Sequence, residues 1–206
     1  MRFLISVIVF LIPSLLLGQS GQSGDEQKSG SAELSAFDAR YGILGQQAPD
    51  WSIKEWVQIS KAAVEKGGLN ISDYRGKVLL LYCFQSWCPG CHSRGFPTLQ
   101  KIQKRMKGDG DFAMVVVQTV FEGKDINTFD KLLPTAQKYK LVCPFGQSER
   151  VRDGTSIMER YRTGGTPWFV LIDKNGVVRA NGYNMEVDKG VAAIRALASE
   201  STVNHP

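Results

Sequence analysis

Two apolar stretches without polar alternation, Lys77–Phe84 and Asp111–Val120, stand out along the chain. Each has the length of a strand, and a continuous apolar run of this kind is typical of a strand that is buried on both faces. Between them, Pro89–Met106 places apolar residues at helical spacing. The pattern therefore predicts two central strands joined by a helix.

The C-terminal part is similarly regular. Trp168–Asp173 is an apolar strand, Lys174–Gly176 contains the Asn-Gly pair favoured in tight hairpins, and Val177–Ala180 is the returning strand. Apolar residues then recur at helical spacing from Val187 to Ala198. This order of elements predicts an α/β fold with a mixed central β-sheet flanked by helices.

Other segments have weaker patterns. Trp51–Glu65 fits a helix, although a short strand near its start is the alternative, and Asp73–Gly76 is typical of a turn. We expect a helix over Asp125–Lys140 with a break at Pro134, a short strand or extended segment over Leu141–Phe145, and a further helix over Ser148–Tyr161.

The N-terminus indicates where the protein works. Arg2 precedes a nearly continuous apolar run, Phe3–Leu17, of about 15 residues, which is typical of a secretory signal peptide and slightly short for a membrane span. We expect a signal peptide over residues 1–20, with an uncleaved membrane anchor as the alternative, then a flexible linker over 21–44, a folded domain over 45–200 and a tail over 201–206. The domain is then extracytoplasmic, either periplasmic or secreted, where disulfide chemistry is permitted.

Composition narrows the class. The 206 residues suit one domain with extensions, and 43% apolar with 22% charged residues excludes a wholly disordered chain or a coiled coil. The net charge of +5 comes from scattered basic residues with no accompanying nucleic-acid-binding motif, so we expect no nucleic-acid partner.

The segment with the clearest chemistry is Cys88-Pro-Gly-Cys91, which lies between the first predicted strand and the helix. Pro89 suits the first helical position, which places Cys88 at the N-cap. There the free backbone N–H groups and the helix dipole would stabilise the Cys88 thiolate, the attacking form of the thiol. Cys91 lies one turn further along the helix, where it could resolve a mixed disulfide.

Three other interpretations of the motif are weaker. Cys88–His92 matches the C-x-x-C-H pattern of c-type haem attachment, but a buried strand leads directly into it. A metal site would need further ligands, and the only other histidine, His205, lies in the tail. A purely structural Cys88–Cys91 disulfide would close too small a loop to stabilise the fold appreciably. We therefore expect neither a metal nor a cofactor.

Several short motifs carry a resemblance to a known family: Ala48–Trp51, Leu69–Lys77, Trp87–Cys91, and Gly165–Pro167 with the strand that follows. On these residues the chain resembles the thioredoxin superfamily, specifically the TlpA-like extracytoplasmic thiol–disulfide oxidoreductases (redoxins), over about residues 46–200. The resemblance implies a thioredoxin-like fold and a cis Thr166–Pro167 bond facing the cysteines, with Thr166 pairing in strand fashion with a substrate chain.

Two departures from the family pattern affect the site. Tyr82 stands where thioredoxins have a buried Asp, so the proton acceptor for Cys91 must be another group, of which Glu122 is a candidate. Pro97 follows Cys91 by six residues rather than the family's five, which predicts a bend in the helix.

Neighbouring residues have simpler interpretations. Cys83 and Cys143 are expected in the core, without a disulfide between them. His92 is expected to be an exposed polar residue. Trp87 is expected at the surface of the site, and Trp168 either lines the same groove or packs in the core.

Together these features predict a thiol–disulfide oxidoreductase in which Cys88 is the nucleophile, Cys91 resolves the mixed disulfide, and Trp87, Thr166 and Pro167 contact the substrate. Its partners would be protein disulfides or dithiols and an upstream thiol electron donor. The protein itself is expected to be a monomer, and the resemblance implies the reductase direction. The alternative is a redox-responsive binding module without turnover. A peroxidase is disfavoured because no PxxxTxxC segment is present.

Overall fold

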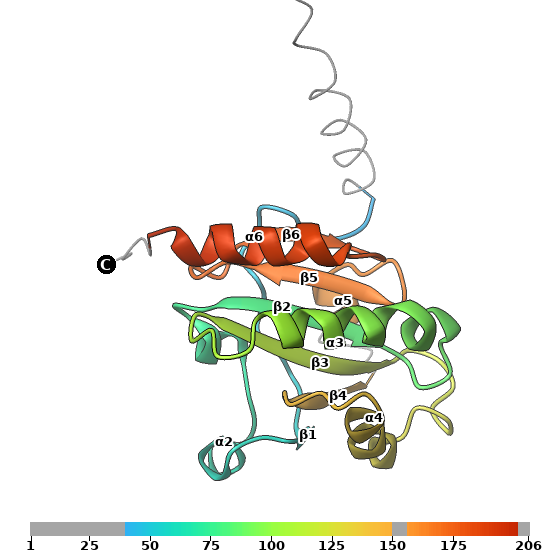
Figure 1. Cartoon of the computed structure of the whole chain (residues 1–206). Helices are drawn as coiled ribbons and strands as arrows, with labels where there is room; N and C mark the ends of the chain where they lie inside the picture. The colour runs from blue at the N-terminus through green and yellow to red at the C-terminus, as the bar shows by residue number, and fades with distance from the viewer. Residues whose placement is uncertain (1–39, 150–155, 202–206) are drawn as a thin grey trace, which may run out of the picture. The chain divides into compact units, whose positions relative to one another are not determined.

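The computed structural model describes residues 40–149 and 156–201 (Figure 1). The predicted signal peptide or anchor, the linker up to residue 39 and residues 202–206 of the tail lie outside these ranges. Within the described part of the chain, no helix has the length and apolar character that crossing a membrane requires.

A six-stranded mixed sheet forms the centre of the fold, in the order β1-β4-β3-β2-β5-β6. The central strand β2 (Val78–Phe84) has all seven residues buried; it pairs parallel with β3 (Phe112–Val120) and antiparallel with β5 (Trp168–Ile172). Strand β4 (Phe145–Glu149) adds parallel to β3. The edge strands β1 (Glu55–Val57) and β6 (Val178–Gly182) are both antiparallel to their neighbours. The predicted α/β class with a mixed sheet is confirmed.

Helices α3 (Phe96–Arg105) and α6 (Val187–Ser199) lie side by side on one face of the sheet (Figure 1). They bury one core cluster with alternate residues of β2, including Leu80, Tyr82 and Phe84. The intervening β2 residues, Leu79, Leu81 and Cys83, face a second cluster with α5 (Ile157–Arg160) and the 3₁₀ turn Ile71–Tyr74. Because both faces are covered, β2 carries no polar alternation.

Two helix predictions are corrected. The helix expected over Ser148–Tyr161 is wrong, because Ser148 belongs to β4 and only Ile157–Arg160 is helical there; residues 150–155 lie outside the described ranges. The segment is a strand because it pairs with β3 and β1, and Trp56 and Ile53 pack over it at Gly146, where an added Cβ would lie 2.8 Å from the Trp56 ring. This tertiary contact is absent from the local sequence pattern.

The helix expected over Asp125–Lys140 is shorter than predicted. It begins with the 3₁₀ turn Phe129–Lys131 and continues as α4 (Leu132–Lys138). Pro134 does not break it, because the proline lies in the first turn of α4, where a backbone N–H has no acceptor within the α-helix. The ambiguous N-terminal stretch contains both alternatives, the strand β1 and then the short helix α2 (Lys61–Glu65), which the Ser60 side chain caps.

Candidate redox site

The two motif cysteines lie where the central strand gives way to the helix. Strand β2 ends at Phe84, a three-residue loop follows, and Pro89 is the first helical residue, so Cys88 occupies the predicted N-cap position. Cys88 and Cys91 form a disulfide with a Cα–Cα distance of 5.3 Å. Cys91 is fully buried, and its backbone N–H donates to the Cys88 sulfur over 3.2 Å. The same N–H would stabilise a Cys88 thiolate after reduction.

The helix that carries Cys91 opens with a π turn over Cys91–Gly95, in which the Phe96 N–H donates to the Cys91 carbonyl. A π turn contains one residue more than an α turn, because its hydrogen bond spans five residues rather than four. The extra residue accommodates Pro97 at its unusual spacing, after which α3 continues regularly to Arg105. The position of Pro97 predicts a bend in this helix; what the structure has there is the π turn.

Tyr82 lies beneath the π turn. Its ring is fully buried, its hydroxyl donates to the Cys91 carbonyl over 3.4 Å, and a Cβ at Gly95 would collide with that hydroxyl. Burial raises the pKa of Tyr82 far above its usual value, so the phenol stays protonated near neutral pH and cannot accept the Cys91 proton. The Glu122 side chain is exposed, and the backbone carbonyl of Glu122 accepts a hydrogen bond from Gln85.

A buried carboxamide network supports the loop before Cys88. The Ser86 backbone N–H donates to Asn127 Oδ1 over 2.7 Å, and the Ser86 hydroxyl bonds to the Gln118 side chain. Gln118 donates to Gln147 over 2.7 Å, and Gln147 donates to the Asn127 carbonyl over 2.8 Å. The sequence interpretation missed this network. The feature of the sequence that could have indicated the network is the presence of polar residues near the ends of apolar strands, such as Gln118 in β3.

His92 belongs to the same support, so the expectation of an exposed side chain is wrong. The ring is half-buried; Nε2 lies 2.7 Å from the Ser86 carbonyl, and Nδ1 lies 2.7 Å from the Tyr139 hydroxyl. A carbonyl only accepts, so Nε2 carries the proton. Both ring nitrogens are therefore engaged, and neither is free for the haem iron that the C-x-x-C-H pattern would suggest.

The second signature meets the cysteine motif in space. The Thr166–Pro167 peptide bond is cis, as the resemblance implies. A Cβ on Gly90 would lie 3.3 Å from Pro167 Cδ, so the proline ring packs against the loop between the cysteines. Thr166 Oγ1 donates to Gln85 Oε1 over 3.5 Å. Segments about 80 residues apart in sequence thus form one surface.

The two tryptophans have different positions. Trp87 is 45% exposed, and its indole lies beside Gly123, where an added Cβ would be 3.7 Å away. This agrees with the surface position predicted for it. Trp168 is fully buried and packs edge-on against Tyr183, which favours the core alternative.

The other two cysteines are not part of the Cys88–Cys91 disulfide. Cys83 and Cys143 are free and buried, as predicted, and burial raises the pKa of each thiol to about 12. Cys83 lies in the core cluster on the opposite face of the sheet from Cys88 and Cys91. Among the residues that the structure describes, no group of three or more His, Cys, Asp or Glu could hold a metal ion.

The Redoxin family model matches residues 43–194. The chain belongs to the Redoxin family. This redoxin is 30% identical to a thioredoxin-like superfamily protein of known crystal structure, over 76% of this chain and 99% of that one, with a TM-score of 0.67. It is also 30% identical to a thiol-disulfide isomerase from Corynebacterium glutamicum, over 75% of this chain and 98% of that one, with a TM-score of 0.63.

A curated relative, probable nucleoredoxin 1 of Arabidopsis thaliana, is 27% identical to the redoxin over 187 residues. The match covers 80% of the redoxin but spans only 30% of the length of that relative. The match to this relative, the family match and the structural neighbours together support the enzyme class predicted from the sequence. The redoxin is a thioredoxin-like thiol–disulfide oxidoreductase.

Proposed function

We propose that this redoxin exchanges disulfides with protein substrates outside the cytoplasm through Cys88 and Cys91, in the manner of the TlpA-like reductases. The observation that carries the proposal is the Cys88–Cys91 disulfide at the start of a helix, beside the cis Pro167. The apolar N-terminal run supports the extracytoplasmic location, and the sequence resemblance supports the reductase direction.

In the reductive cycle, the Cys88 thiolate attacks one sulfur of a substrate disulfide. A Cys88–substrate disulfide forms, the substrate S–S bond breaks, and the first substrate thiolate leaves and takes a proton from water. The Cys91 thiolate then attacks the Cys88 sulfur and displaces the second substrate thiolate. The substrate disulfide has gained two electrons, and the enzyme is left with the Cys88–Cys91 disulfide, which an upstream dithiol reduces.

We assign the substrate-binding surface to Trp87, Thr166 and Pro167. Trp87 offers an exposed apolar ring next to the cysteines, and Thr166 is half-exposed beside the loop that leads to them. A substrate chain paired in strand fashion with the Thr166 backbone would present its disulfide sulfur to Cys88. Main-chain pairing of this kind binds polypeptides with little dependence on their sequence.

The test is reduction of a two-chain disulfide protein by the purified enzyme with dithiothreitol as the reductant. Cys88→Ser is expected to abolish the enzymatic rate, and Cys91→Ala is expected to accumulate the mixed disulfide with Cys88. Cys143→Ala serves as the matched control, because it removes a buried thiol outside the motif. Full activity of Cys88→Ser would refute the mechanism. Substrate binding that survives replacement of both motif cysteines, without turnover in the native protein, would instead favour the binding-module alternative.

A further inference from the structure

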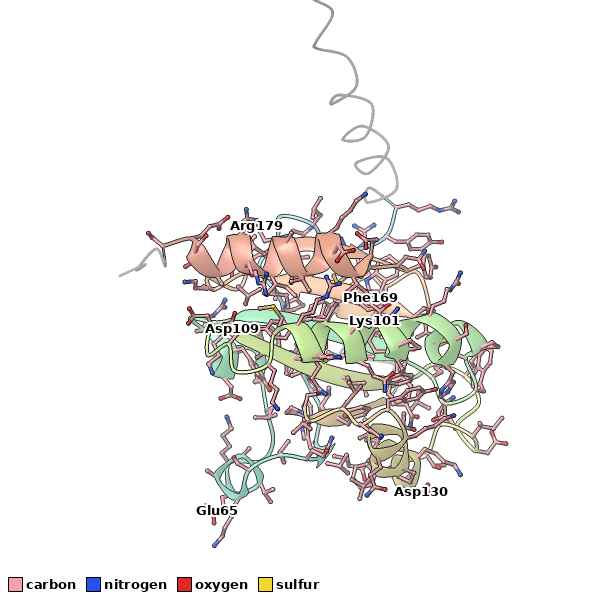
Figure 2. The ribbon with its side chains drawn as sticks, viewed as in Figure 1. Glu65, Lys101, Asp109, Asp130, Phe169 and Arg179 are labelled. Atoms are coloured by element: carbon pink, nitrogen blue, oxygen red, sulfur yellow. A yellow bond between two sulfur atoms is a disulfide. The ribbon has the colours of Figure 1, made fainter. Side chains whose placement is uncertain are left out.

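A cavity lies close to the cysteine motif, because Ser93 and Arg94, which line it, follow Cys91 on the same helix. It has a volume of about 290 Å³ and lies between the start of the α3 helix and the segment that follows β6. Its polar lining comes from Ser93, Arg94, Thr98, Lys101 and Asn184. Phe169 contributes an apolar wall, and Figure 2 shows it beside Lys101, where α3 faces α6.

The charged residues that line this cavity are all basic. Arg94 and Lys101 line it, and none of its lining residues is acidic. Over residues 40–149 and 156–201, neither cation has a hydrogen bond or an ion pair, whereas Arg105, further along the same helix, pairs with Asp188. The carboxylate of Glu186 is already engaged with the N–H groups at the start of α6.

Arg94 also lies next to the redox motif. A Cβ on Gly90 would be 3.6 Å from Arg94 Nη2 and 3.3 Å from Pro167 Cδ. The guanidinium therefore lies against Gly90, between the two cysteines, and the cis-proline ring packs against the same glycine. A polypeptide held at Thr166 with its disulfide at Cys88 would place neighbouring side chains within reach of the cavity.

We propose that this cavity binds the carboxylate of an Asp or Glu close to the disulfide in the substrate polypeptide. The inference rests on the proposed function and adds a substrate preference to it. The planar Arg94 guanidinium can donate two parallel hydrogen bonds to a carboxylate, and Lys101 adds a positive charge. The Ser93 and Thr98 hydroxyls lie in the same wall and can donate to the same oxygens.

The expected preference is modest because both cations are exposed. An exposed ion pair contributes at most about a fivefold change in affinity, and the factors of two cations multiply to at most about 25-fold. Below that limit, we expect an acidic substrate to be favoured by about tenfold in kcat/KM. Salt screens such contacts over a distance of about 10 Å at 0.1 M, so the preference should shrink as the ionic strength rises.

The experiment compares two disulfide peptides of equal length that differ only by Glu or Gln two residues from one cysteine. Turnover of each peptide with dithiothreitol is measured for the native protein, for Arg94→Gln/Lys101→Gln, and for Lys104→Gln. Lys104 lies on the same helix but lines a different cavity, so Lys104→Gln shows what the loss of a positive charge outside the proposed site does. We expect the ratio of kcat/KM values, acidic over neutral, to fall from about ten to about one in the double variant only.

Equal rates with both peptides in the native protein would overturn the inference. So would a preference that persists in the double variant or disappears equally in Lys104→Gln. Glutathione disulfide is a small anionic disulfide. If the double variant lost activity towards glutathione disulfide but kept the same ratio for the two peptides, a polypeptide ligand would also be ruled out. Failure of the proposed function is distinct, because neither peptide would then be turned over by the native protein.

Discussion

Gly95→Ala tests the packing that positions Cys91. Helix propensity alone predicts that alanine in place of a helical glycine stabilises the protein by about 1 kcal/mol. The structure predicts the opposite sign. The new Cβ would collide with the Tyr82 hydroxyl and would lie 2.6 Å from Tyr82 Cζ and 3.0 Å from Cε2.

Tyr82 cannot move away to relieve the collision. Its ring is fully buried, with ring centroids 4.8 Å from Phe169 and 5.4 Å from Phe96. Overpacking against a neighbour that cannot yield costs up to about 3 kcal/mol. After the gain in propensity, we expect Gly95→Ala to lower the free energy of unfolding by about 2 kcal/mol.

A double-mutant cycle isolates the contact. Tyr82→Phe removes the hydroxyl, so in that background Gly95→Ala should cost at least about 1 kcal/mol less. The assay is urea unfolding of the oxidised protein followed by circular dichroism. Gly110→Ala is the control, because an added Cβ there has open space around it. If Gly95→Ala were as stable as the native protein, or if the coupling energy between the two substitutions were near zero, the predicted collision with the Tyr82 hydroxyl would be refuted.

Three further predictions follow from the same site and core. Because burial raises the pKa of Cys83 and Cys143 from near 9 to about 12, the folded state holds protons that the unfolded state releases. Stability should therefore fall as the pH rises from about 9 towards 12, by up to about 1.4 kcal/mol per pH unit for each thiol; replacing both with alanine should flatten the profile measured by urea titration. Trp87→Ala should lower kcat/KM for a protein disulfide by about tenfold while changing stability by less than about 0.5 kcal/mol, since nearly half of the side chain is exposed to solvent. Unaltered kinetics would show that Trp87 does not contact the substrate. His92→Leu should destabilise the protein by about 2 kcal/mol and Tyr139→Phe by about half as much. The first change breaks two part-buried hydrogen bonds of the His92 ring, and the second breaks only the bond between His92 and the Tyr139 hydroxyl. Equal losses of stability would show that only the bond between the two side chains matters.

Individual residues show why parts of the site escaped sequence interpretation. Cys88 and Pro89 were predictable, because a strand, an N-cap and a first-turn proline are local signals. His92 was misjudged, because its partners come from the loop before Cys88 and from Tyr139 at the end of α4. Nothing within a few residues of a histidine reports a contact made 47 residues away.

Local pattern determined the central strands, the C-terminal hairpin and the cysteine pair at a helix start, because continuous apolar runs, Asn-Gly and a capping position act over a few residues. Tertiary structure alone decided that β4 is a strand, that a π turn absorbs the extra residue before Pro97, and that the cis-proline Pro167 packs against Gly90. Each of these outcomes depends on side chains that come from distant parts of the sequence and pack against the segment in the fold. Burial and steric exclusion by distant side chains outweigh local propensities of about 1 kcal/mol.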